Sequence, residues 1–513
     1  MLKACIFVTG ISGIVAEYVM ATLASYLLGD AVLHWTLVIS LMLFAMGVGS
    51  RFSLVFREPL LDTFIGVELI LSMLVAASAP LVYLLSAYTS WVALIIYPMA
   101  FAIGMLIGLE LPLVTRLNET FEALHLNIGR VLEKDYYGAL IGGLFFALVG
   151  LPYLGLTYTP LVLGALNLTV ASYLAWRYRS ALSWPLPLAL GVLVVAMCLV
   201  ALGLMVEPIV RFGEQHKYRD RVIYQEQTRF QRIVMTRWKD DVWLYLDGHQ
   251  QLSSADEERY HEPLVHPAMK LAAARHRVLV IGGGDGVAIR EVLKHGDVEA
   301  VTLVELDPAV TQLATTHPEL RRVNRDSLAA PRVEIVHRDG YGFLLESDER
   351  FDVVIIDLPD PRTTSLARLY SRPFYELVVR HLSPGGVLVT QATSPFFSRR
   401  AFLSILKSIR ATGLPAVPLH NHVPTLGEWG WVIAQRGPAT LEEAVERNRV
   451  DLRERLLALD FSDIETRFLN AEAMISMLHF GKGVFDELET IDVSEESNLA
   501  VFTYYRNSDW DLY

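Results

Sequence analysis

The sequence predicts an amino-terminal, polytopic α-helical membrane domain followed by an α/β domain that begins with a small β-rich subdomain. Of the 513 residues, 53% are hydrophobic and only 19% are charged. The long uncharged runs lie before Glu207, and charge density after that point is that of a globular protein. From residue 277 onward, apolar strands alternate with helical segments. Such a chain is too long for one domain and too apolar for an ordinary soluble enzyme.

Long apolar segments predict about seven membrane-spanning helices within residues 1–207, since about 20 apolar residues cross the hydrocarbon core. The segments are 4–28, 32–50, 62–86, 91–115, 136–155, 158–176 and 185–206. The first is too long for the apolar part of a signal peptide and further spans follow it, so we expect it to be retained. Cys5 and Cys198 both lie in these segments, which argues against a disulfide framework.

Residues 277–440 are predicted to form the α/β core, with 208–276 as the β-rich subdomain and 441–513 as a helical extension. Strands such as "RVLVIGGG", "AVTLVELD" and "FDVVIIDLPD" are apolar throughout, which indicates a parallel sheet covered on both faces. A glycine-rich turn follows the first strand and opens a helix, and Glu305 ends the second strand. This layout is typical of a Rossmann-like, methyltransferase-type domain whose acid holds ribose hydroxyls.

Acidic residues follow four successive strands: Asp285, Glu305, Asp339 and Asp357. The carboxyl ends of parallel strands meet at one edge of a sheet, so these acids should line one site, although each alone could also cap a helix. Such a site would repel the phosphates of a dinucleotide or ATP and attract a sulfonium or alkylammonium cation. This pattern favours S-adenosylmethionine-type chemistry. The net charge of −12 argues against a nucleic-acid partner.

A series of motifs along residues 220–440 resembles the polyamine aminopropyltransferases, the spermidine synthase family, and in particular its membrane-anchored branch. In order they are "RFQRIVM", "YLDGHQQLSSADEERYHEPLVHPAM", "VLVIGGGDGVAIREVL", "VTLVELD", "HRDG", "FDVVIIDLPDP" and "LYSRPFYELVVRHLSPGGVLVTQ". The "LDG…Q…DE..YHE" element is the most specific of them, because ordinary methyltransferases lack it.

The resemblance implies transfer of an aminopropyl group from decarboxylated S-adenosylmethionine to a diamine, usually putrescine, giving spermidine and methylthioadenosine. Neither a metal nor a resident cofactor is implied. His261 and Asp360 would lie along the amine channel, and Asp357 would accept the proton. The residues that would hold the nucleoside donor are Gln231, Asp285, Glu305, Asp339 and Gly340.

The sequence departs from the family pattern at two places in the acceptor side of the site, which is the part expected to bind the amine. "RTTSLARLYS" follows "DLPDP" where many soluble members have a Gly-Pro turn, and Glu428 and Trp429 stand where they have an aromatic and small polar residues. The donor is therefore better supported than the identity of the amine. Two alternatives stay open: a methyltransferase on the same fold, and a non-enzymatic polyamine sensor or transporter. The "YHE" element and Asp357 favour the aminopropyltransferase.

The basic residues at the ends of the predicted spans and the chemistry of the catalytic domain predict opposite orientations in the membrane. With seven spans, the basic ends lie on one side, and the positive-inside rule would make that side cytoplasmic and the catalytic domain external. A donor made inside the cell instead favours a cytoplasmic catalytic domain, which we expect for this multi-pass protein of the cell (inner) membrane. The expected partners are the lipid bilayer and the amine, and the sequence leaves open whether the protein forms a homo-oligomer. The basic residues are Lys3, Arg51, Arg57, Arg116, Arg130, Lys134, Arg177 and Arg179.

Overall fold

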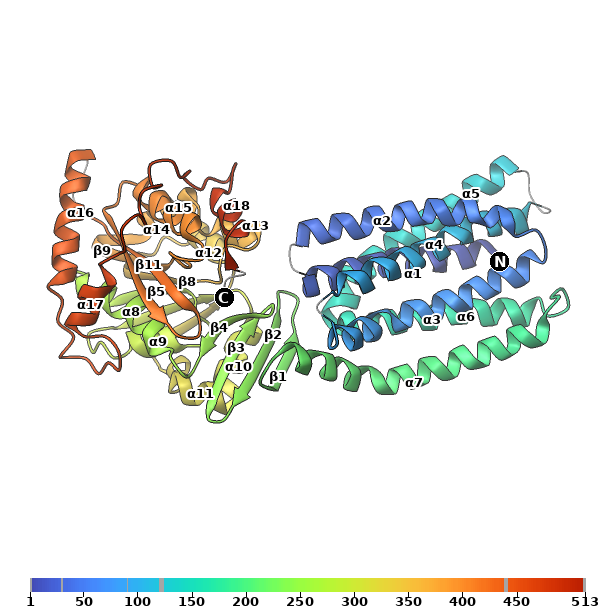
Figure 1. The fold of residues 1–513 in the computed structure, drawn as a ribbon, viewed down its shortest axis with the longest axis horizontal. Coiled ribbons are helices and arrows are strands. Elements are labelled where there is room, and N and C mark those ends of the chain that lie inside the picture. The colour runs from blue at the N-terminus through green and yellow to red at the C-terminus, as the bar shows by residue number, and fades with distance from the viewer. Residues whose placement is uncertain (1, 29–30, 90, 120–123, 438–441, 511–513) are drawn as a thin grey trace. The chain divides into compact units, whose positions relative to one another are not determined.

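The computed structural model describes residues 2–28, 31–89, 91–119, 124–437 and 442–510 (Figure 1). The chain divides into two compact units, Met1–Val222 and Ile223–Tyr513. The first consists almost entirely of helices, and the second combines helices with two sheets. The predicted border at 440/441 lies outside the described residues.

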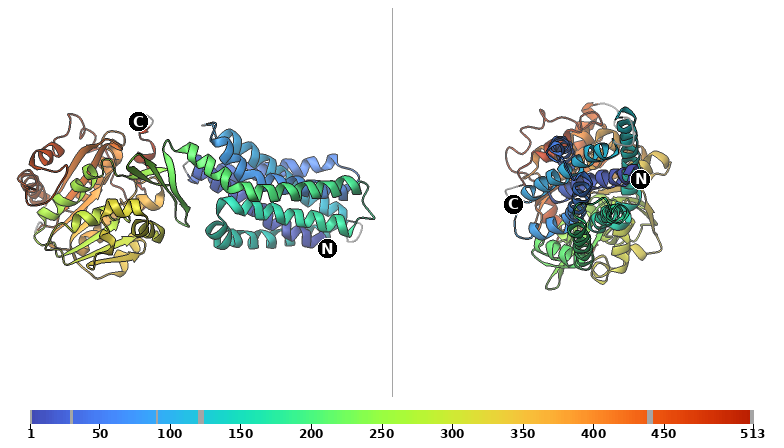
Figure 2. Two further views of the ribbon diagram at one scale, coloured as in Figure 1. Left: turned by 90° about the horizontal axis from the view of Figure 1, so that it is seen from below. Right: turned by 90° about the vertical axis from the view of Figure 1, so that its right-hand side faces the viewer.

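Long helices with broadly aligned axes make up the first unit (Figures 1 and 2). Apolar side chains from α1, α3 and α4 form much of its interior. The elements are α1 (Leu2–Leu28), α2 (Ala31–Phe52), the 3₁₀ turn η1 (Ser53–Val55), α3 (Leu60–Ser86), α4 (Ala93–Asn118), α5 (Leu124–Phe145), the π-helical η2 (Phe146–Leu154), α6 (Gly155–Arg177) and α7 (Pro185–Lys217).

Among the described residues, six stretches are long and apolar enough to cross a membrane: Cys5–Leu28, Leu33–Val55, Leu60–Ser86, Ala93–Asn118, Leu126–Arg177 and Pro185–Lys217. The predicted spans 136–155 and 158–176 fall into the single stretch Leu126–Arg177, which is 52 residues long. That stretch is not one regular helix, since η2 and the positive φ of Gly155 (+63°) separate α5 from α6.

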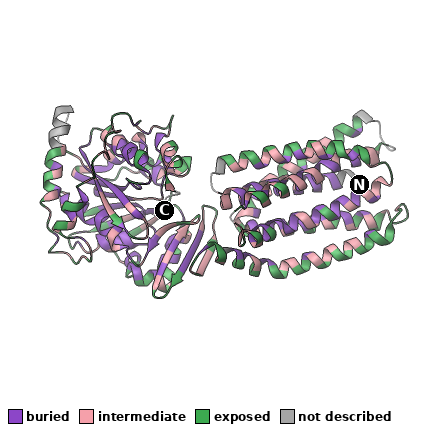
Figure 3. Ribbon diagram, in the orientation of Figure 1, coloured by how far each residue is buried: buried purple, intermediate pink, exposed green. Residues whose placement is uncertain are grey.

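Helix α7 extends past the predicted end of the last span at residue 206 and reaches Lys217. Hydropathy marks where the apolar stretch ends and does not mark where the helix ends. Glu207 and Arg211 continue the helix beyond that point with an i,i+4 ion pair of 2.5 Å. Much of α7 is exposed (Figure 3), including the apolar side chains of Leu186, Leu190, Leu193, Val194, Met197, Val200, Leu204 and Met205.

The second unit begins with a four-stranded sheet in the order β1-β2-β3-β4, and helix α8 follows it. Strands β2, β3 and β4 pair antiparallel, as expected for a meander with short turns. The bounds are β1 (Arg221–Gln227), β2 (Arg232–Trp238), β3 (Asp241–Leu246), β4 (His249–Ser253) and α8 (Glu258–Leu271).

A seven-stranded sheet in the order β10-β11-β9-β8-β5-β6-β7 forms the centre of the second unit. Its strands are β5 (Arg277–Gly282), β6 (Ala300–Glu305), β7 (Val333–His337), β8 (Phe351–Asp357), β9 (Leu382–Gln391), β10 (Ala416–Val423) and β11 (Gly427–Gln435). Its helical elements are α9 (Val287–Val292), α10 (Pro308–Thr316), α11 (Pro318–Asn324), η3 (Ser327–Ala329), α12 (Gly340–Glu346), α13 (Thr364–Arg368), α14 (Arg372–His381) and α15 (Arg399–Arg410). After the sheet come α16 (Glu442–Leu457), α17 (Ala471–Met477) and α18 (Ala500–Arg506).

Strands β5 to β9 pair in parallel and give the predicted Rossmann-like core. Along β5, Val278 and Val280 join one apolar cluster while Leu279 and Ile281 join another, so the sheet is covered on both faces. The last two strands lie outside that prediction: β11 pairs antiparallel with both β9 and β10. Their connection is only residues 424–426, which is too short for a parallel crossover.

Candidate active site

The sheet register brings the predicted acids to one edge. Ile281 pairs with Val304 and Gly282 pairs with Asp357, so Glu305 and Asp357 end the two strands that flank β5. Gly282 has a φ of +79°, and a Cβ there would lie 2.1 Å from the carbonyl oxygen of Asp357. Only glycine fits at this position, because a side chain would be both strained and in collision with the neighbouring strand.

Glu305 lies against the glycine-rich turn. A Cβ on Gly284 would come within 2.6 Å of Glu305 Oε2, so the turn needs glycine here for the carboxylate to approach. Glu305 Oε1 accepts a hydrogen bond of 3.0 Å from the backbone N–H of Asp307. Burial, together with the charges of Asp307 and Asp285, raises the pKa of Glu305 to about 7.

Asp285 and Asp339 both bond to helix amino termini. Asp285 is 7% exposed, and its Oδ1 accepts from the N–H of Val287 at 2.8 Å. Asp339 is exposed and caps α12 by accepting from the N–H of Gly342 at 2.8 Å. The capping interpretation therefore holds for Asp339, whereas the N-cap of α9 is Gly286 and not Asp285. Both bonds are compatible with a ligand-binding role. Gly340 is buried against Ile281.

Gln231 is hydrogen-bonded to Asp307, an aspartate that the sequence reasoning missed. Its Nε2 donates to Asp307 Oδ2 at 3.1 Å, and the Thr228 hydroxyl donates to the same oxygen at 2.8 Å. Asp307 is 2% exposed and is the N-cap of α10, where it accepts from the N–H of Ala309. An aspartate followed directly by Pro308 is a recognisable helix-start signal and could have identified this residue.

Asp357 is held by Tyr260, which lies in the "YHE" element but was not singled out. The Tyr260 hydroxyl donates to Asp357 Oδ1 at 2.7 Å. Burial raises the pKa of Asp357 to about 6, while the charge of His261 and the Tyr260 hydrogen bond limit the rise. A carboxylate with this pKa is ionised at neutral pH and can still take up a proton.

Asp360 is 5% exposed and is also bonded by a tyrosine. The Tyr505 hydroxyl donates to its Oδ2 at 2.9 Å, and Gln391 Nε2 donates to its Oδ1 at 3.3 Å. Burial raises the pKa of Asp360 to about 6, against the effect of these hydrogen bonds. Tyr505 comes from α18, far beyond the quoted motifs, and no sequence signal indicated it.

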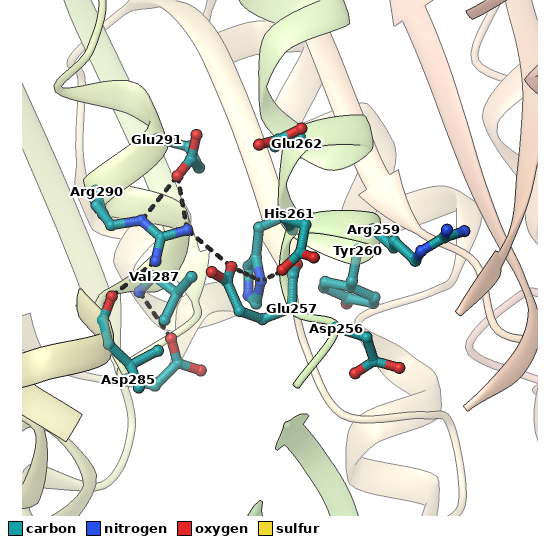
Figure 4. A network of polar contacts seen from close by, with 12 residues as sticks. Asp256, Glu257, Arg259, Tyr260, His261, Glu262, Asp285, Val287, Arg290 and Glu291 are labelled. Carbon is teal, nitrogen blue, oxygen red and sulfur yellow. Dashed lines mark hydrogen bonds and ion pairs between the residues drawn. The ribbon is translucent and has the colours of Figure 1, made fainter. Parts of the chain in front are cut away.

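His261 begins a buried network of charges that Figure 4 shows. Its Nδ1 lies 3.0 Å from the carbonyl oxygen of Glu257 and 3.4 Å from Glu257 Oε2. Arg290 Nη2 pairs with Glu257 Oε2 at 2.8 Å and with Glu291 Oε1 at 2.7 Å. Burial opposes the charge on His261, but the bond to Glu257 and the charges of Asp285 and Asp357 raise its pKa to about 9. Glu257 and Arg290 lie inside the family motifs, but the sequence reasoning did not identify them as residues of the site.

Glu428 and Trp429, the second departure from the family pattern, have different surroundings in the structure. Glu428 pairs with His420 on the neighbouring strand β10. Trp429 is 8% exposed and its ring lies 6.3 Å from that of Tyr260, beside the residue that holds Asp357. Of these two residues, Trp429 is therefore the one that is placed to affect an acceptor.

Comparison with known proteins identifies the family. The profile of the spermine/spermidine synthase domain matches residues 257–444. The polyamine aminopropyltransferase 2 of Aquifex aeolicus is 39% identical over 507 residues, which covers 98% of each chain. The chain belongs to the polyamine aminopropyltransferase family. The Oceanobacillus iheyensis polyamine aminopropyltransferase is 39% identical, covering 93% of this chain and 90% of that one, and the Leptospira interrogans protein is 36% identical, covering 97% and 96%.

Family membership confirms the prediction of a transferase that moves an aminopropyl group, and sets aside the methyltransferase and non-enzymatic alternatives. The aligned length includes the helical unit, so the relatives extend over both parts of the chain. A solved spermidine synthase from Thermotoga maritima is 30% identical and covers 53% of this chain and 88% of its own, with a TM-score of 0.45.

Proposed function

We propose that this protein transfers the aminopropyl group of decarboxylated S-adenosylmethionine to putrescine, giving spermidine and methylthioadenosine. The observation that carries the proposal is the pair of carboxylates Asp357, at the end of β8, and Asp360, just beyond it, each bonded by a tyrosine hydroxyl. Two carboxylates three residues apart suit a diamine, since one can face the attacking nitrogen while the other anchors the distal ammonium.

The chemistry requires a base and little else. An alkyl amine has a pKa near that of lysine, about 10.4, and arrives protonated. In our proposal Asp357 accepts a proton from the ammonium as its nitrogen attacks the carbon next to the sulfonium. The new C–N bond forms, the C–S bond breaks, and its electron pair neutralises the sulfur of departing methylthioadenosine. The positive sulfur already activates the leaving group, so the transfer needs neither a metal nor a resident cofactor.

The donor side would be formed by the acids at the sheet edge. Glu305 would accept the ribose hydroxyls, Asp285 would face the amino tail of the donor, and Asp339 with Gly340 would meet the adenine edge. Gln231 would complete this side from the β-rich subdomain, supported by its bond to Asp307. His261 would lie along the amine channel, where its contact with Glu257 fixes the imidazole.

We further propose that the helices up to about residue 207 anchor the chain in the cell (inner) membrane. Exposed leucine, valine and methionine side chains along α7 would be unfavourable in water and suit contact with lipid. The catalytic unit, Ile223–Tyr513, would face the cytoplasm, where the donor is made. A reporter that is active only in the cytoplasm, fused after Tyr513, should be active. Activity only of an external reporter would overturn this orientation.

The decisive experiment for the proposed function is an assay of the full-length protein in detergent. With decarboxylated S-adenosylmethionine and putrescine it should release methylthioadenosine and spermidine in equal amounts. Failure to form either product, by a folded protein tested with a panel of other amines, would overturn the proposal. Methylthioadenosine formed with another amine would change only the acceptor.

Glu305→Gln should weaken donor binding about ten- to a hundredfold, because a carboxylate makes stronger, charge-assisted hydrogen bonds to hydroxyls than an amide does. The ranking of amines should stay the same. Calorimetric titration with methylthioadenosine measures the change, and Glu299→Gln, an exposed glutamate before the start of the same strand, is the control. Unaltered affinity in Glu305→Gln would mean that the ribose binds elsewhere.

A further inference from the structure

The carboxyl-terminal segment, residues 492–510, is fixed to the helices of the catalytic unit at several points along its length. The Ser404 hydroxyl donates to the carbonyl oxygen of Asp492 at 2.8 Å, and Arg368 pairs with Glu496 at 3.0 Å. At its far end, the N–H of Asp509 donates to the carbonyl oxygen of Phe397 at 3.0 Å. These contacts determine where α18 and residues 507–510 lie.

This segment places two aromatic rings beside the residues proposed to bind the amine. Trp510 lies 6.4 Å from Trp429 and 5.5 Å from Tyr505, measured between ring centroids. Trp429 lies in turn 6.3 Å from Tyr260. Tyr260, Trp429, Trp510 and Tyr505 thus form a continuous aromatic cluster.

Both ends of the aromatic cluster bond to a carboxylate. Tyr260 donates to Asp357 at 2.7 Å, and Tyr505 donates to Asp360 at 2.9 Å. Aromatic faces next to carboxylates form an environment that suits an alkylammonium, because the rings cover the methylenes and attract the cation while the carboxylates balance its charge. The carboxyl-terminal segment contributes half of this cluster, including the residue bonded to Asp360.

We propose that the carboxyl-terminal segment is part of the acceptor site and determines which amines are accepted. Tyr505 is a positioning residue that acts through Asp360, and Trp510 is a specificity-determining residue that limits the space beside Trp429 and Tyr505. This inference rests on the proposed function, because it assigns Asp360 to the distal ammonium. It adds residues that lie outside the segment matched by the synthase domain, 257–444.

Tyr505→Phe removes the hydrogen bond to Asp360 and keeps the ring. The full-length enzyme should show a KM for the diamine raised roughly tenfold, with a smaller change in kcat and none in affinity for methylthioadenosine. Tyr504→Phe is the matched control, since this neighbour on α18 donates to Asp492 at 2.9 Å and its loss should leave KM unchanged. Equal shifts in both variants, or no shift in Tyr505→Phe, would overturn the positioning role.

Trp510→Ala should reduce discrimination among diamines of three, four and five methylenes. One methylene in a fitted apolar site is worth about 10–200-fold in kcat/KM, and we expect this ratio to fall to about threefold or less. Trp510→Phe should recover most of the discrimination, because it retains a ring. Trp238→Ala, which removes an exposed tryptophan, is the control and should behave like the unmodified enzyme.

The two proposals fail in different ways. If the unmodified protein transfers an aminopropyl group and Trp510→Ala keeps its full preference among the diamines, the role of the segment is wrong while the proposed function stands. Loss of methylthioadenosine binding in Trp510→Ala would also overturn the role of the segment in amine selection, because the segment would then support the fold as a whole. An unmodified protein inactive with every diamine would overturn both proposals.

Discussion

Asp357→Asn should lower turnover by roughly 10²–10⁴-fold, the usual contribution of general-base catalysis. The substitution keeps the size and polarity of the side chain, and the Tyr260 hydroxyl can still donate to its oxygen, as it does at 2.7 Å in the native enzyme. What is lost is the negative charge and the ability to take up a proton. Affinity for methylthioadenosine should stay near normal, so single-turnover kinetics with saturating donor measure the loss directly.

The contribution of Asp357 to turnover should depend on pH. Burial raises the pKa of Asp357 to about 6, and only the ionised form can act as a base. In the native enzyme kcat/KM should therefore rise as pH increases through about 6. The deficit of Asp357→Asn should shrink as pH rises further toward the pKa of the amine, about 10.4, because more acceptor then arrives unprotonated.

Two results would contradict the role of Asp357. A deficit that stays constant up to about pH 10 would mean that the carboxylate only positions the ammonium, and Asp360 would become the candidate base. An equal loss in Asp352→Asn would point to a general effect on β8, since Asp352 lies near the opposite end of that strand and accepts from the N–H of Arg277. We expect Asp352→Asn to turn over normally.

The alternation of apolar strands and helices was enough to predict the parallel core, because strands buried on both faces lack the two-residue alternation of exposed sheets. It could not predict the antiparallel β10–β11 pair. Pairing direction there depends on a three-residue connection, and the strand sequences themselves do not encode it. The part of α7 beyond residue 206 could not be predicted for a related reason. The criterion of about 20 apolar residues reflects the thickness of the hydrocarbon core, whereas a helix continues as far as its backbone hydrogen bonds do.

The candidate site could be predicted where its residues follow strands in the motifs. Asp357 and Glu305 are examples, since the register of a parallel sheet brings such positions to one edge. Arg290 and Glu257 were overlooked because charged residues on a helix are usually solvated, and only the fold shows that they are buried. Tyr505 contacts Asp360 across 145 positions of sequence, and no local pattern reports a contact of that range.

Replacing Arg290 with methionine should destabilise the catalytic unit by about 3–5 kcal/mol, the usual cost of removing one partner from a buried ion pair. The guanidinium pairs with Glu257 and Glu291, whose side chains are 3% and 0% exposed. Glu291 would keep His266 at 2.9 Å and Lys294 at 2.6 Å. The cost therefore falls mainly on Glu257, which would be left with His261 as its cationic partner.

Hydrogen exchange of peptides from β5 and β8 measures this loss in the intact protein, because the most protected amides report the opening of the whole catalytic unit. Arg338→Met is the matched control: its ion pair with Glu346 has the same 2.8 Å separation, but the side chains are 47% and 62% exposed, so the change should stay within about 1 kcal/mol. Arg290→Lys should recover part of the stability, since it restores the charge without the two-sided guanidinium geometry. Equal protection in Arg290→Met and Arg338→Met would mean that Glu257 can be neutralised or hydrated without Arg290. The network would then not be needed to hold His261 in place.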